Sequence, residues 1–102
     1  MKRATTPTHI FTLPFSYSET VSKCLITYKQ NDEIVLTKTE KDIQVENDKD
    51  IVVKLTQEET ISFKPNTLVK MEIRVLTKNG DALASNIMQK AVEDVLNDEV
   101  LL

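Results

Sequence analysis

Acidic residues around one turn are of a type that binds calcium. Glu46, Asp48 and Asp50 alternate along the segment 46–50, and Ca²⁺ takes carboxylate oxygens as ligands. The twelve-residue loop with a central glycine that would position such ligands is missing, because the only glycine of the chain is Gly80. We therefore expect solvated turn carboxylates here and no metal site.

The chain has one histidine and one cysteine. His9 alone provides neither a two-histidine metal site nor a histidine relay within one chain, so we expect a structural or solvent-facing role. Cys24 excludes an internal disulfide and a multi-cysteine metal site. It falls on the apolar phase of an expected strand, which favours a small buried hydrophobe over a reactive thiolate.

The remaining polar candidates have structural explanations. Thr56 and Glu59 have the spacing of a capping box, and Glu58 suits the first turn of the same helix. None of the serines has the context of a nucleophile elbow. Tyr17 and Tyr28 are expected to pack at a sheet rim. We predict no catalytic, cofactor-binding or metal-binding residue, no cofactor and no enzymatic activity.

The elements that would position these residues are mostly strands. Residues 68–77 alternate apolar and charged side chains, which predicts a strand with one buried face. Asn79-Gly80 then predicts a type I′ turn, in which both central residues have positive φ. The returning arm, residues 82–92, is less regular, and we expect a bulge at 84–86 that shifts its face pattern by one residue.

The N-terminal strand is expected at a sheet edge. In the segment Thr8–Phe15, alternate apolar residues share one face, and they are Phe11, Leu13 and Phe15. Proline cannot donate a hydrogen bond to a neighbouring strand. Pro7 and Pro14 therefore restrict this strand to an edge.

The rest of the chain completes an all-β pattern. We expect strands over 21–29, 33–39, 43–45 and 51–55, and a short helix over 57–63 that carries the chain from one sheet to the other. About seven short strands predict a two-sheet antiparallel sandwich, immunoglobulin-like in layout. A barrel of five or six strands is the alternative.

Composition restricts the partners. With 102 residues the chain forms one domain, and its 13 basic and 16 acidic residues are interspersed, giving a net charge of −3. No basic block is available for a phosphate backbone, and no apolar run approaches the roughly 20 residues of a membrane span. No apolar segment follows Met1-Lys2-Arg3, so we expect no signal peptide. We predict protein partners, with no nucleic acid or membrane and no small molecule.

The C-terminal segment is a candidate interaction site. We expect a sandwich domain over 1–92 and an acidic, apolar arm over 93–102. The arm is more apolar than a free tail, and its candidate contact residues are Val95, Leu96, Val100, Leu101 and Leu102. The alternative is that these side chains pack on their own domain.

Segments spread over nearly the whole chain resemble a family of small, uncharacterised proteins in prophages and related mobile elements of Gram-positive bacteria. The segments are 6–15, 26–31, 54–60, 74–77, 82–86 and 92–96. The layout is also similar to the immunoglobulin-like N-terminal domains of phage baseplate upper proteins. The resemblance carries over no catalytic or ligand residue.

The resemblance implies a phage or prophage structural or accessory protein in the host cytoplasm or the virion. Such a protein would act through contacts with itself or with other phage proteins. A monomeric binding module that engages a host protein is the alternative function.

Overall fold

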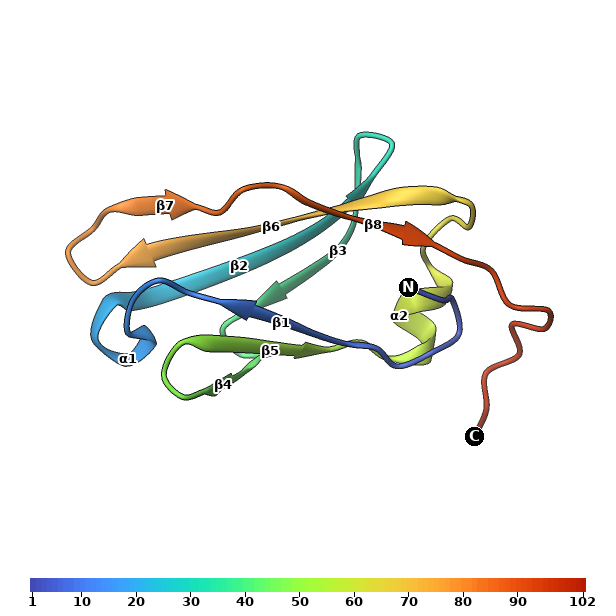
Figure 1. Ribbon diagram of the computed structural model, residues 1–102, viewed down its shortest axis with the longest axis horizontal. Helices are drawn as coiled ribbons and strands as arrows, with labels where there is room; N and C mark the ends of the chain where they lie inside the picture. The colour runs from blue at the N-terminus through green and yellow to red at the C-terminus, as the bar shows by residue number, and fades with distance from the viewer.

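Two antiparallel sheets pack face to face in the computed structural model, which describes residues 1–102 (Figure 1). The smaller sheet has the order β1-β5-β4, with strands Thr8–Thr12 (β1), Asp50–Lys54 (β5) and Gln44–Glu46 (β4). In the larger sheet the order is β3-β2-β6, with strands Glu33–Thr39 (β3), Val21–Gln30 (β2) and Thr67–Thr77 (β6). Two short strands, Ala82–Ala84 (β7) and Met88–Val92 (β8), follow one another along the outer side of β6. The predicted two-sheet antiparallel sandwich is confirmed.

The core lies between the sheets and consists mainly of the alternate apolar residues of their strands. Ile26 of β2, Val69 of β6 and Ile51 of β5 are all inaccessible to solvent. Tyr28 is equally buried, so its predicted place at a sheet rim is wrong. Its hydroxyl lies 2.7 Å from Nδ1 of His9, and this hydrogen bond offsets the cost of burying a polar group.

Two short helices connect the sheets. Tyr17–Thr20 (α1) leads into β2, and Gln57–Ile61 (α2) joins β5 of the smaller sheet to β6 of the larger one. The predicted capping box is present: the Glu59 N–H donates to Thr56 Oγ1 at 3.1 Å, and the Thr56 N–H donates to Glu59 Oε1 at 2.9 Å. Neither helix is long and apolar enough to span a membrane.

The turn between β6 and β7 differs from the expected type I′ turn. Gly80 has a φ of +89°, but Asn79 does not have positive φ. The Gly80 N–H donates to the Thr77 carbonyl at 3.0 Å, and the Thr77 N–H donates to the Asp81 carbonyl at 2.8 Å. The loop therefore has three residues rather than two, with glycine supplying the left-handed residue that closes such a loop.

A turn with two positive-φ residues occurs instead between β2 and β3. Asn31 and Asp32 have φ values of 49° and 65°, and they lie between the paired residues Gln30 and Glu33. Short polar side chains that bond locally make the left-handed region accessible to Asn and Asp. Glycine is therefore unnecessary at this turn.

The predicted bulge lies between β7 and β8. Val75 pairs with Leu83, whereas Met71 pairs with Met88, so four steps along β6 correspond to five along the returning arm. The extra residue moves the inward face from odd to even positions. At this point the Ser85 N–H donates to the Ile73 carbonyl at 2.8 Å, and the Ile73 N–H donates to Ser85 Oγ at 3.0 Å. The serine hydroxyl thus takes the place of a backbone carbonyl in the ladder.

Candidate functional site

The acidic turn uses its carboxylates within the fold. Asp48 accepts hydrogen bonds from the hydroxyls of Ser16 and Ser18 and from the Ser18 N–H, the last at 2.7 Å. The hydrogen bond from Ser16, followed by those from Ser18, lowers the pKa of Asp48. Asp50 accepts from Thr12 Oγ1 at 2.7 Å. This cluster fixes α1 to the turn between β4 and β5, and no group of three or more potential metal ligands occurs in the structure.

His9 and Cys24 are both buried. Burial, followed by the charge of Lys90, lowers the pKa of His9, which pairs with the Tyr28 hydroxyl. Burial and the nearby Glu40 carboxylate raise the pKa of the Cys24 thiol to about 11. The thiol therefore remains protonated at neutral pH, and the prediction of a small buried hydrophobe is confirmed.

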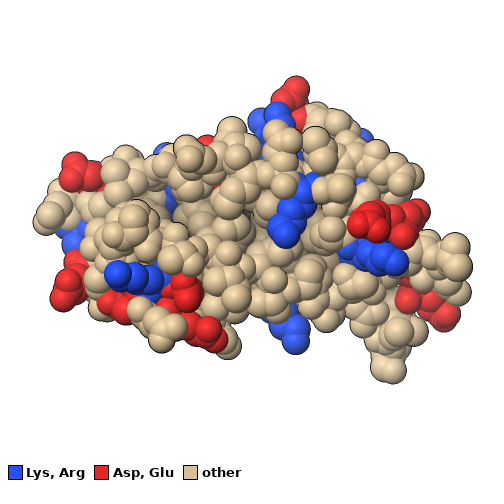
Figure 2. Space-filling model, in the orientation of Figure 1, with Lys and Arg blue, Asp and Glu red and all other residues tan.

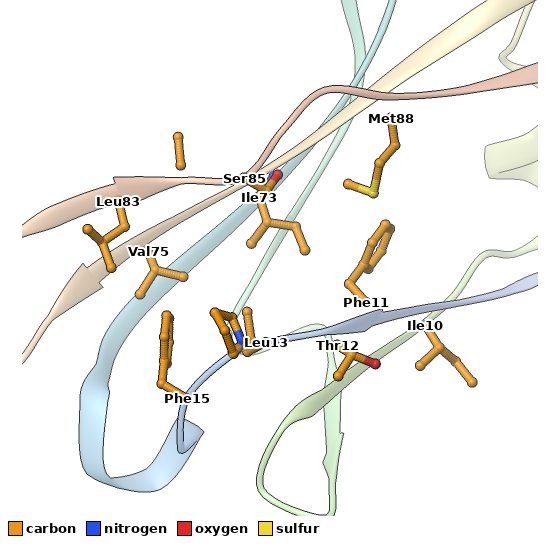
Figure 3. A pocket seen from close by; sticks show the side chains of 12 residues that line it. Ile10, Phe11, Thr12, Leu13, Phe15, Ile73, Val75, Leu83, Ser85 and Met88 are labelled. Atoms are coloured by element: carbon orange, nitrogen blue, oxygen red, sulfur yellow. The ribbon is translucent and has the colours of Figure 1, made fainter.

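An apolar groove opens along one side of the sandwich, where the two sheets do not meet (Figure 3). Its volume is about 470 Å³. One wall is β1 and its continuation to Phe15, and the other is formed by β6, β7 and the start of β8. Nine of its twelve lining residues are hydrophobic. The inward-pointing side chains are Phe11, Leu13, Phe15, Ile73, Val75, Leu83 and Met88.

Both rims of the groove are free strand edges. On β1, Leu13 donates to the Lys49 carbonyl and Pro7 accepts from the Leu55 N–H, so the odd-numbered residues turn their backbone groups toward β5. The backbone groups of Thr8, Ile10 and Thr12 alternate with these and point away from β5. β1 pairs only with β5, and β7 pairs only with β6. The expected edge position of the N-terminal strand is confirmed.

The floor of the groove is uncharged, but its two ends differ. Lys90 follows Met88 by two residues on the inward face of β8, near the start of β1, whereas Lys54, opposite Thr8, lies on the outer face of the smaller sheet. At the other end, Asp50 pairs with Thr12. Figure 2 shows the uncharged surface between β7 and β1, with acidic and basic side chains side by side toward both ends of this face.

The C-terminal arm lies at the far end of the molecule from β7 (Figure 1). Arg3 Nη1 contacts the carboxylates of Asp94 at 2.7 Å and Asp98 at 3.6 Å. The side-chain amide of Gln57 holds the backbone of Leu101, donating to its carbonyl at 2.9 Å and accepting from its N–H at 2.8 Å. Polar contacts therefore fix the arm to α2 and to the N-terminal segment.

The candidate contact residues of the arm are only partly covered. Val95 and Val100 are half-buried, whereas Leu96 and Leu102 are fully exposed and Leu101 is 76% exposed. The arm is thus held by its backbone and acidic side chains while its leucines face solvent. Within one chain, none of these five residues lines the groove.

Sequence reasoning did not predict the groove. The alternating apolar residues of the first strand and its flanking prolines indicated a sheet edge. They did not indicate that the second sheet would end beside this edge. The position of that second edge depends on β7 being short and on the bulge that follows it.

Comparison of the chain with protein-family models, with curated proteins and with solved structures finds no match.

Proposed function

We propose that this protein is a non-enzymatic structural or accessory component of a phage or prophage that acts through protein–protein contacts. The observation that supports the proposal is the apolar groove with a free strand edge on each side. The prophage setting rests on the sequence resemblance alone.

A groove of this kind suits an extended segment of another protein. The unpaired backbone groups of Thr8, Ile10 and Thr12 offer hydrogen bonds to an added strand, and strand addition is a common mode of peptide recognition. Alternate side chains of the added strand would cover Phe11 and Leu13, which lie on the groove wall. Main-chain bonds provide affinity in this mode, and the apolar floor selects the side chains.

The free edges have only modest protection against unspecific pairing. Pro14 lies on the outward backbone phase of β1 and removes one donor, and the bulge after β7 interrupts the opposite rim. These features limit the length of strand that can pair. A short, apolar segment is therefore favoured over a long one.

Site-specific photocrosslinking tests the proposal in the cell that makes the protein. A benzophenone-bearing amino acid replaces Leu83, which lines the groove and is 44% exposed. The matched control carries it at Leu68, which is 49% exposed on the outer face of β6. We expect a discrete protein adduct at Leu83 and none at Leu68. No adduct at Leu83, or the same adducts at both positions, would contradict the proposal.

A monomeric module that engages a host protein is the second candidate function. Ile10 and Leu83 form exposed apolar rims on opposite sides of the groove, as expected of a surface that receives a partner. Solution mass separates the two candidates: a monomer at all concentrations, together with a host-protein adduct at Leu83, would favour this module.

A further inference from the structure

The C-terminal arm carries leucines that a single chain leaves exposed to solvent. We infer that the C-terminal residues Val100–Leu102 of one copy occupy the apolar groove of a second copy, so that the chains associate head to tail. This inference rests on the proposed role of the groove and names its occupant. It joins two apolar surfaces that a single chain leaves uncovered, the groove and the leucines of the arm.

The geometry favours a second copy over the chain's own arm. β8 runs away from β7, and the arm continues in this direction to α2, where the backbone of Leu101 is held by Gln57 (Figure 1). The groove lies on the other side of β8, beside Leu83 and Phe15. Leu101 must leave Gln57 in either case, but to enter its own groove the arm would also have to reverse its direction.

Charge complementarity supports both the occupant and its direction. Asp98 and Glu99 immediately precede Val100–Leu102. Lys90 lies on the inward face of β8, two residues beyond Met88, at the end of the groove where β1 begins. Placing the two carboxylates beside this lysine directs the three apolar residues along the uncharged floor toward Phe15. The opposite direction would bring the carboxylates next to Asp50 and Asp48.

The arm is held weakly enough to exchange. The Asp94 and Asp98 carboxylates that contact Arg3 are 43% and 57% exposed, and ion pairs that solvent reaches contribute little to stability, although Arg3 itself is only 13% exposed. Leu101 and Leu102 lose little packing when they leave, because they are already exposed, and only the half-buried Val100 gives up contacts. The contact between copies is heterologous, so the assembly forms a ring if the rotation closes and a filament if it does not.

Light scattering over a concentration series tests the inference with full-length variants. The unmodified chain, of 11.6 kDa, is expected to rise to at least twice its monomer mass. A groove variant, Leu83→Glu, and an arm variant, Val100→Asp with Leu102→Asp, should each remain monomeric. The matched control Leu68→Glu should assemble as the unmodified chain does. Circular dichroism checks that all variants are folded.

Mixing the two monomeric variants provides the decisive observation. Each retains the element that the other lacks, so the mixture should give a dimer that grows no further. A symmetric interface of another kind would not be restored by mixing. A monomeric unmodified chain, assembly that persists in either variant, or a mixture that remains monomeric would overturn the inference. In each of those cases, a Leu83 adduct with a different protein would leave the proposed function intact.

Discussion

The two sides of the space between the sheets are closed in different ways. On the α2 side, hydrogen bonds join separate elements: Gln30 donates to the Lys64 carbonyl at 3.0 Å and accepts its N–H at 2.8 Å, and Lys38 of β3 lies 2.6 Å from Glu59 of α2. On the groove side, β1 and β7 end beside each other without a bond between them. The comparison indicates that α2 secures the fold and that the open side is available for contacts.

Large-to-small substitutions should give the largest difference between the two sides. Phe63 is 1% exposed and its ring centroid lies 5.9 Å from that of Tyr28, so Phe63→Ala should lower the free energy of unfolding by about 3–5 kcal/mol. Leu83→Ala on the open side should cost less than about 1 kcal/mol, because the side chain is already half exposed. Urea denaturation measures the free energy of unfolding of both variants. Equal decreases in the two would contradict the proposed difference between the closed side and the open side.

Arg3 should show that the closed side extends into the N-terminal segment. Its Nε and Nη2 donate to the carbonyls of Phe63 and Ile61, each at 2.9 Å, which satisfies the end of α2. We expect Arg3→Ala to lower the free energy of unfolding by about 1.5–3 kcal/mol, the range for a hydrogen bond to a charged group. Arg74→Ala, on the exposed face of β6, is the control and should have little effect. Comparable losses in the two variants would argue against this role.

The cap of α2 should contribute less. Thr56→Ala removes the acceptor of the Glu59 N–H and should lower the free energy of unfolding by about 1 kcal/mol. Thr56→Ser retains the acceptor and should behave nearly as the unmodified protein in the same denaturation measurement. If the serine variant lost as much as the alanine variant, the cap would not be the cause.

The smallest expected effect is a pH dependence from His9. Its pKa lies below the ordinary value of 6.5 because of burial, so the unfolded chain binds a proton more readily than the folded one. Its contribution to stability is therefore fully present above pH 6.5 and is lost as the pH falls through the folded-state pKa. Denaturation midpoints measured from pH 7.5 downward should fall more in the unmodified chain than in His9→Gln. If the denaturation midpoint fell equally with pH in both proteins, His9 would not be the source of the pH dependence.

Local patterns predicted the elements, but not how they meet. The alternation in residues 68–77, the capping box at Thr56 and the edge position of the first strand were all evident from neighbouring residues. The type I′ assignment at Asn79-Gly80 failed because a three-residue loop also ends in glycine. Tyr28 was misplaced because its buried partner, His9, is nineteen residues away. The groove depends on two sheet edges whose separation no local pattern contains.

The bulge at Ser85 makes the length of an exposed segment important. Ser85, Asn86 and Ile87 are all exposed, so a deletion among them resembles a harmless shortening of a loop. Removing one residue would abolish the bulge and leave four steps on the arm opposite four on β6, so Met88 would still pair with Met71. Removing two residues would put every later side chain of β8 out of phase, so that Met88 and Lys90 would turn to solvent and Gln89 and Ala91 would face the core. Substitutions at Asn86 and the loss of one residue there should therefore be tolerated by β8, whereas the loss of two should not.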